Sequence, residues 1–179
     1  MNRHPHENHE RASAEMAQPE FGIIVASTSR YHEKKSGKEV TDESGDRVVA
    51  AASKAGFKVT FRTLVDDEIH EIRYAILKSI VDVRCDVCVV VGGTGISGRD
   101  VTVEATRPLL DKSLPGFAVR FQLESIEQVG SSAMISRAVA GVLRKSLVVC
   151  LPGSPEAVDK GMEILIPAVK HMLFIARKD

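Results

Sequence analysis

Three short apolar runs constrain the fold of this chain more than any other feature of its sequence. They cover residues 21–27, 87–91 and 147–151. A strand with one face in water alternates apolar and polar residues, whereas a strand covered on both faces is apolar throughout. The three runs therefore predict buried strands of a parallel sheet. Residues 58–64, which alternate and are rich in β-branched side chains, predict one more strand.

Helical patterns separate these strands. Apolar residues recur at the spacing of one helix face, and residues typical of helix caps flank several of the segments. The last helix shows this clearly, because Ser154 is a suitable N-cap and Pro155 suits the first helical position. The polar segment after residue 27 has no such pattern and is expected to be a loop. Helices are predicted over 42–55, 66–83, 102–112 and 131–145, within 116–128, and after residue 154.

Strands that alternate with helices predict an α/β fold, a three-layer α/β/α sandwich of the Rossmann-like kind around a mostly parallel central sheet. The length of 179 residues suits one domain. We assign this domain to 21–179, because residues 1–20 have almost no apolar content. That segment contains His4, His6 and His9. A metal-binding arm is one interpretation, but a disordered tail is favoured because no partner ligands follow at regular spacing.

The charge balance narrows the classes of partner. The chain has 24 basic and 24 acidic residues and a formal net charge of zero. This balance gives little support to nucleic-acid binding or to attachment at a membrane surface. No stretch approaches the ~20 apolar residues of a membrane span, and the polar N-terminal segment does not resemble a signal peptide. A cytoplasmic location is therefore expected.

Cys85 and Cys88 match a C-x-x-C motif, which can bind metal or carry redox chemistry. Here the motif leads directly into the apolar run 87–91, and residues three apart on a strand face opposite sides. Packed thiols are therefore the favoured interpretation. A turn at this point would be needed for the metal or redox alternative.

The loops that follow the predicted strands contain the candidate ligand-binding residues, because ligands in open α/β sheets bind beyond the carboxyl ends of the strands. After residue 91 come Gly92, Gly93, Thr94 and Gly95. Glycines allow positive φ and let consecutive N–H groups approach a phosphate. A tight turn with no ligand is the alternative. The segment matches neither a Walker A loop nor a dinucleotide-binding fingerprint.

Two carboxylates lie in the same group of loops. Asp67 follows the strand predicted over 58–64, and Asp100 lies five residues past the glycines. Together they can hold Mg²⁺ against a polyphosphate, because Mg²⁺ prefers oxygen ligands. Each also precedes a predicted helix, so an N-cap role is an equally good interpretation. Arg30 and Arg99 can contact anions, although exposed loop arginines commonly have no specific role.

The segment around the glycines resembles the T-G-G-T-G…R-D-V-T-P-E-A-T signature of the MoaB/MogA proteins of molybdenum cofactor biosynthesis. Val91 and Val103 replace a Thr and a Pro of that signature. Two later segments resemble the family's G-x-x-A-x-x-S-R-A and L-P-G-S-P motifs, and residues 42–45 resemble the D-x-S-G of the MoaB branch. The similarity runs in order from Phe21 to the C-terminus. The matching segments are VGGTG at 91–95, RDVT at 99–102, EAT at 104–106, GSSAMISRA at 130–138 and LPGSP at 151–155.

The resemblance implies the molybdopterin-binding fold and an enzyme that adenylylates molybdopterin with Mg-ATP, giving molybdopterin-AMP and pyrophosphate. It implies that Asp67 and Asp100 are the catalytic carboxylates and the Mg²⁺ ligands, with Asp66 as a one-position alternative for the first. It also implies a homotrimer or homohexamer and a downstream metal-insertion protein as partner. The implied substrate- and nucleotide-binding residues are Gly92, Gly93, Thr94, Gly95, Ser131, Ser132, Ser136, Arg137, Pro152, Gly153 and Ser154.

Alternatives stay open for some residues of this set and for the function. The three serines can merely cap a helix, and Arg137 can pair on the surface instead of binding a phosphate. Besides the enzyme, a molybdopterin-binding or assembly protein without turnover is possible, and a generic nucleotide-binding domain is a weaker third alternative. The enzyme is favoured because both Asp67 and Asp100 are present, and a pure binder of an anionic ligand needs no pair of carboxylates.

Overall fold

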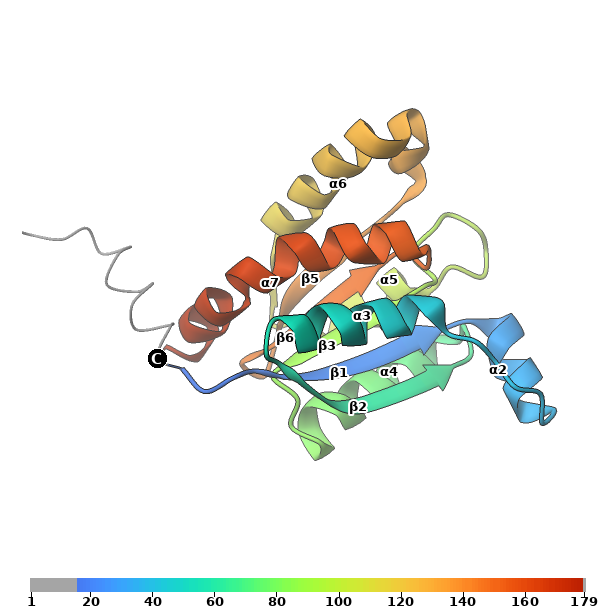
Figure 1. Ribbon diagram of the computed structural model, residues 1–179, viewed down its shortest axis with the longest axis horizontal. Helices are drawn as coiled ribbons and strands as arrows, with labels where there is room; N and C mark the ends of the chain where they lie inside the picture. The colour runs from blue at the N-terminus through green and yellow to red at the C-terminus, as the bar shows by residue number, and fades with distance from the viewer. Residues whose placement is uncertain (1–15, 179) are drawn as a thin grey trace, which may run out of the picture.

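A computed structural model describes residues 16–178 of the chain. These residues form one six-stranded sheet with helices on both faces (Figure 1). The strands are β1 (Glu20–Ala26), β2 (Lys58–Val65), β3 (Val87–Val91), β4 (Lys112–Ser113), β5 (Val139–Leu143) and β6 (Ser146–Leu151). Their order across the sheet is β2-β1-β3-β6-β5-β4. The pairs among β2, β1, β3 and β6 are parallel, and the pairs that add β5 and β4 are antiparallel.

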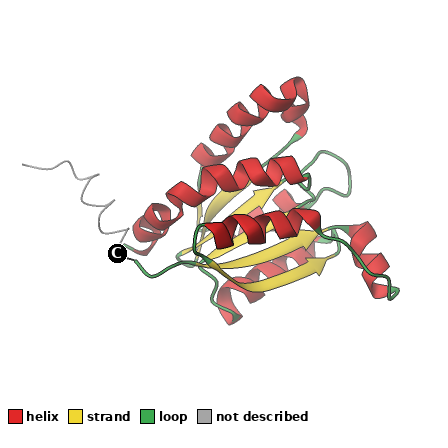
Figure 2. Cartoon of the chain, viewed as in Figure 1, coloured by secondary structure: helices red, strands yellow, loops and turns green. Residues whose placement is uncertain are grey.

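Helices cover both faces of the sheet, which confirms the predicted three-layer sandwich (Figure 2). The helices of one layer are α3 (Glu43–Lys54), α6 (Pro115–Val129) and α7 (Pro155–Arg177). The other layer contains α4 (Ile69–Leu77), which continues as a π-helical turn at Lys78–Asp82, and α5 (Thr102–Thr106). A short helix, α2 (Thr28–Lys35), lies beyond the carboxyl end of β1 (Figure 1).

The strands are apolar throughout because both of their faces are covered. In β1, Ile23 and Val25 pack in the cluster formed with α3 and α7, while Ile24 packs in the cluster formed with α4. In β3 every residue is buried. Each large apolar side chain buried in this way contributes about 1.5–3 kcal/mol to folding, so the central strands stabilise the fold strongly. The prediction of buried parallel strands is confirmed.

The helix predicted over 131–145 is wrong. The chain there forms a 3₁₀ turn at Gly130–Ile135 and then β5, whose residues are all buried. Met134, an apolar residue within the predicted helix, is 71% exposed. Arg144 and Lys145, both with positive φ, make the tight turn that joins β5 to β6 as a hairpin. A short apolar run fits a buried strand as well as a helix, so spacing alone selected the wrong element.

Two other segments differ from their predictions. The helix predicted over 102–112 ends at Thr106 and passes into a 3₁₀ turn at Arg107–Leu109, because Pro108 has no N–H to continue a helix. The expected loop after residue 27 contains α2. This helix buries no residue, so its sequence lacks the apolar stripe on which the prediction of a helix depends.

The predicted N-terminal tail falls mostly outside the described residues, and so do His4, His6 and His9. Of its last residues, Met16 packs partly against the core, and β1 begins at Glu20. Across residues 16–178, none of the helices has the length and apolar character needed to cross a membrane.

Cys85 and Cys88 are free and fully buried, in agreement with the packed-thiol interpretation. Burial raises the pKa of the Cys88 thiol. A raised pKa disfavours the thiolate, which is the form that binds metal or attacks disulfides. Within the described part of the chain, no three His, Cys, Asp or Glu side chains are grouped as a metal site.

Candidate functional site

The candidate site is a cleft of about 400 Å³ at the carboxyl end of the parallel strands. The strand register brings these ends to one level: Val25 of β1 pairs with Val91 of β3, which pairs with Leu151 of β6. The loops after β1, β2, β3 and β6 therefore meet at the cleft, as expected for an open α/β sheet. The sequence-predicted residues that line it are Asp67, Gly92, Gly93, Thr94, Gly95, Asp100, Ser136, Pro152 and Gly153, and they are joined by Ser27, Arg30, Arg99 and Ile135.

The glycines after β3 are required because the backbone there passes close to other groups. Gly92 and Gly93 have φ angles of 98° and 62°. A Cβ on Gly92 would lie 2.3 Å from the carbonyl oxygen of Ala26. A Cβ on Gly93 would lie 2.4 Å from Thr102 Oγ1. Both the conformation and the space therefore exclude a side chain, and the bare backbone forms part of the cleft wall.

Asp67 is held by the start of α2. Its Oδ2 accepts hydrogen bonds from the Thr28 N–H at 2.7 Å and from the Thr28 hydroxyl at 3.0 Å. Its Oδ1 is buried and has no hydrogen-bond partner among the described residues. A Cβ on Gly93 would lie 3.1 Å from this oxygen, which places it beside the glycine backbone. The N-cap of α4 is Glu68, so capping does not account for Asp67.

Asp66, the one-position alternative, is directed elsewhere. Its Oδ2 lies 3.3 Å from Nε2 of His32 in α2, and its Oδ1 accepts a hydrogen bond from the Asp67 N–H. Asp66 is not among the residues that line the cleft. The geometry therefore favours Asp67 as the first carboxylate.

Asp100 lies at the end of loop 92–100. Its Oδ2 accepts a hydrogen bond from the Ser97 N–H at 2.8 Å. Burial acts to raise the pKa of Asp100, but hydrogen bonds from Ser97 and Gly95 and the charge of Arg137 outweigh burial. The pKa is therefore below its ordinary value, and Asp100 is negatively charged at neutral pH. The N-cap of α5 is Val101, so Asp100 does not cap that helix.

Arg137 holds loop 92–100 from outside the cleft. Its guanidinium group donates hydrogen bonds to the carbonyl oxygens of Thr94 at 3.2 Å, Gly95 at 2.8 Å and Asp100 at 3.0 Å. It also forms a two-point ion pair with Glu104 of α5. This hydrogen bonding lowers the pKa of Glu104. Of the two interpretations of Arg137, the geometry favours pairing over phosphate binding, because its donors are used by the loop and by Glu104.

The predicted serines are divided between the first cleft and an adjoining cleft of about 350 Å³ between α6 and the start of α7. Ser136 lines both, and its Oγ is buried with no hydrogen-bond partner within residues 16–178. Ser132 and Ser154 line only the second cleft. Ser154 also caps α7, because its hydroxyl oxygen accepts a hydrogen bond from Ala157 N–H at 3.3 Å. Ser131 is exposed and lines neither cleft.

The first cleft has the chemical groups of a phosphate and Mg²⁺ site. Among the described residues that line it, the charged ones are Arg30, Asp67, Arg99 and Asp100. Guanidinium groups and backbone N–H groups bind phosphate. Mg²⁺ is commonly held by one or two carboxylates together with substrate phosphates. The buried, unpartnered Oδ1 of Asp67 is an oxygen ligand of this kind, so the residues present fit Mg²⁺.

The contact of α2 with Asp67 could not be predicted from the sequence. Thr28 fixes Asp67 across 39 positions of sequence, and no local pattern marks such a contact. The only available signal was the position of Thr28 and Arg30 directly after a predicted strand. Because the segment was interpreted as a loop, Thr28 was given no role and Arg30 was named only as a residue that can contact anions.

Fold and cleft together define a class of protein: a three-layer α/β/α domain with a glycine loop and two carboxylates at the carboxyl edge of its parallel strands. The family model described as "Probable molybdopterin binding domain" matches residues 22–171. The chain belongs to this family, and the resemblance to the MoaB/MogA proteins is confirmed.

Relatives of the chain cover nearly its whole length. It is 39% identical over 159 residues to the molybdenum cofactor biosynthesis protein B of Bacillus subtilis, a match that covers 88% of this chain and 89% of the relative. It is 38% identical over 162 residues to the molybdopterin adenylyltransferase of Pyrococcus furiosus, covering 88% and 91%. A crystal structure of a molybdenum cofactor biosynthesis protein B superposes with a TM-score of 0.83 at 36% identity, covering 91% of this chain and 98% of that one.

Proposed function

We propose that the protein is a molybdopterin adenylyltransferase, which transfers the adenylyl group of ATP to molybdopterin. One observation carries the proposal: Asp67 and Asp100 reach the same cleft as the bare backbone of Gly92 and Gly93. Relatives named for this activity are 38% identical to the chain over most of its length. The site residues and their roles are our assignments from the geometry.

The reaction is a substitution at the α-phosphorus of ATP. A phosphate oxygen of molybdopterin forms the new bond to this phosphorus, and the bond to the bridging oxygen of the β-phosphate breaks. Pyrophosphate leaves with the electron pair of that bond. A phosphate oxygen is already deprotonated at neutral pH, so the protein needs no strong general base.

The residues of the cleft contribute by binding and orientation. Positioning the two substrates in line supplies much of the rate enhancement in phosphoryl and nucleotidyl transfer. The Gly92 N–H donates to the Leu151 carbonyl oxygen, so the N–H groups that would bind phosphate oxygens are those of the residues that follow it in the loop. When bound, Mg²⁺ would be held by Asp67 and Asp100 and would offset the negative charge of the triphosphate.

A binding protein with the same cleft but no turnover is the second candidate. The buried Oδ1 of Asp67 argues against it, because a carboxylate oxygen without a partner is costly and would repel an anionic ligand in the absence of a cation. Incubation of the purified protein with molybdopterin and Mg-ATP tests the distinction. Detection of molybdopterin-AMP by mass spectrometry supports the enzyme. Binding of molybdopterin with no adenylate formed would favour the second candidate.

The proposal extends to assembly and location. An exposed apolar stripe on α6 supports a homo-oligomer, because large apolar side chains in one row commonly mark a protein interface. A trimer or hexamer, a cytoplasmic location and transfer of the adenylate to a metal-insertion protein all remain predictions. The residues of the stripe are Val119, Leu123, Ile126 and Val129, each between 44% and 60% exposed.

A further inference from the structure

Arg30 is a cleft residue that the fold uses only in part. It projects from α2, lines the cleft and is 33% exposed. Among the described residues its guanidinium group makes one hydrogen bond, from Nη1 to Asp42 Oδ1 at 3.3 Å. A guanidinium group has five N–H donors. Most of the donors of Arg30 are therefore free to bind a ligand.

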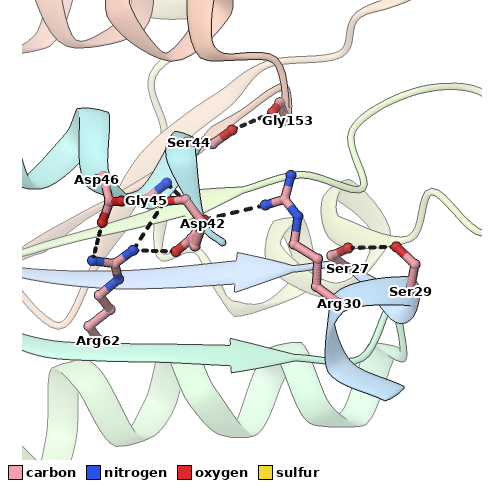
Figure 3. A network of polar contacts seen from close by, with 9 residues as sticks. All are labelled: Ser27, Ser29, Arg30, Asp42, Ser44, Gly45, Asp46, Arg62 and Gly153. Carbon is pink, nitrogen blue, oxygen red and sulfur yellow. Dashed lines mark hydrogen bonds and ion pairs between the residues drawn. The ribbon is translucent and has the colours of Figure 1, made fainter. Parts of the chain in front are cut away.

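Both carboxylate oxygens of Asp42 have hydrogen-bond partners other than Arg30. Its Oδ2 accepts a hydrogen bond from Arg62 at 2.5 Å, and its Oδ1 accepts one from the Gly45 N–H as the N-cap of α3. Arg62 also binds Asp46 at 2.7 Å. Figure 3 shows Arg62 and the start of α3 on one side of Asp42 and Arg30 on the other. The hydrogen bond from Arg30 to Asp42 is long and single. It therefore orients the guanidinium group of Arg30 and leaves its other donors available to a ligand.

The start of α3 also holds a second residue that lines the cleft. Ser44, which is 1% exposed, donates a hydrogen bond to the carbonyl oxygen of Gly153 at 2.7 Å (Figure 3). Gly153 lines the cleft together with Arg30. The first turn of α3 thus holds both residues, which pre-organises the space between them. Pre-organised groups bind more tightly because less freedom is lost on binding.

Arg99, the other positively charged residue of the cleft, is not oriented by a contact of its side chain with another described residue. It is exposed on loop 92–100, and its side chain has no partner within the described part of the chain. Binding through Arg99 would require a long and unrestrained side chain to become ordered. The contrast singles out Arg30.

We propose that Arg30 binds a phosphate group of a substrate, with Asp42 as its positioning residue. The inference rests on the proposed function for the source of the phosphate, which is the triphosphate of ATP or the phosphate of molybdopterin. The chemistry is the same in both cases: two parallel hydrogen bonds from a planar guanidinium group to phosphate oxygens. The glycine backbone supplies neutral N–H donors, and Arg30 supplies a positive charge.

Titration calorimetry with inorganic pyrophosphate, ATP and molybdopterin as separate ligands tests the proposal. Arg30→Gln keeps hydrogen-bonding capacity but removes the charge, and it is expected to weaken binding of at least one ligand by about 10-fold to 100-fold. Arg30→Lys is expected to recover part of the loss, because it keeps the charge without the planar fork. Arg120→Gln is the matched control. It makes the same change of residue at an exposed arginine that pairs with Glu124 and does not line the cleft, so affinity should stay unchanged.

The pattern of losses decides the source of the phosphate. A loss confined to pyrophosphate and ATP assigns Arg30 to the nucleotide, and a loss confined to molybdopterin assigns it to the pterin phosphate. Unchanged affinity for all three ligands in folded Arg30→Gln would overturn the inference, as would failure of the unsubstituted protein to bind any of them. Because these are binding measurements, an inactive protein that loses affinity on Arg30→Gln would contradict adenylyl transfer and leave this inference intact.

Discussion

Asp67 and Asp100 are held by hydrogen bonds from N–H and hydroxyl groups and, among the described residues, by no direct ion pair. Asp67 binds Thr28, and Asp100 binds the Ser97 N–H. Other carboxylates near the cleft, such as Asp42 and Glu104, pair directly with arginines. The negative charges of Asp67 and Asp100 are thus not neutralised by a paired arginine among the described residues and can interact with a bound cation. This difference separates the two proposed catalytic carboxylates from their structural neighbours.

Asp67→Asn and Asp66→Asn are expected to have different effects. Asn at 67 can still accept both hydrogen bonds from Thr28, so the fold should persist while the charge is lost. Turnover should fall by roughly 10² or more, because losing a preorganised electrostatic group costs about 3 to 4 kcal/mol. Asp100→Asn should behave in the same way. Asp66→Asn, which faces His32, should retain most activity in steady-state assays. Equal losses at 66 and 67 would contradict the assignment.

Gly93→Val is expected to abolish phosphate binding. The new side chain would have to adopt a φ near 62° and would meet Thr102 Oγ1, which should cost roughly 1–3 kcal/mol of stability. Gly98→Val is the matched control, because a Cβ at Gly98 meets no atom within 4 Å. Thermal unfolding and ATP titration of both variants check the prediction. Normal ATP affinity in folded Gly93→Val would remove the glycine backbone from the site.

Among the larger elements, loop 92–100 depends on a side chain that lies far away in sequence. Arg137 follows the 3₁₀ turn after α6, and it links the loop to α5 through Glu104. The contact joins two of the sequence segments that resemble the family signature, 91–106 and 130–138. We infer that Arg137 fixes the position of Asp100 rather than touching a substrate.

Arg137→Met is expected to loosen this loop. The variant keeps much of the apolar stem but removes hydrogen bonds to three carbonyl oxygens and the pair with Glu104. Hydrogen exchange of the amides in 92–100 should accelerate, and stability should fall by about 1–2 kcal/mol at this partly exposed site. Arg120→Gln removes an exposed pair with Glu124 and should change neither quantity much. Unchanged exchange in Arg137→Met would show that the loop is held by other contacts.

The elements that could be predicted from sequence are those with one clear local pattern. β1 and β3 are apolar runs, and α3 and α7 have caps and apolar stripes. β5 could not be recognised, because its identity depends on pairing with β6 through a turn at Arg144 and Lys145. α2 buries nothing, so the pattern that marks a helix is absent.

For the whole molecule, topology explains why part of the site was predictable. Parallel strands end at one edge, so the glycines and Asp67 could be placed together from strand order alone. The contacts of Thr28 with Asp67, of Arg30 with Asp42 and of Arg137 with the loop could not be predicted, because they depend on side-chain directions across distant segments. Arg30 itself was named only as a residue that can contact anions. Sequence also could not show which of the predicted serines line the cleft, since Ser136 does and Ser131 does not.

Adenylyl transfer in this cleft makes pyrophosphate release from ATP depend on molybdopterin, and release can be measured with and without the pterin. The purified protein is incubated with Mg-ATP, and released pyrophosphate is followed by a coupled assay. We expect release only when molybdopterin is present, in a one-to-one ratio with molybdopterin-AMP, and a rate roughly 10² lower in Asp100→Asn. Release at the same rate without molybdopterin, or no release with it, would contradict the assignment of adenylyl transfer to this cleft.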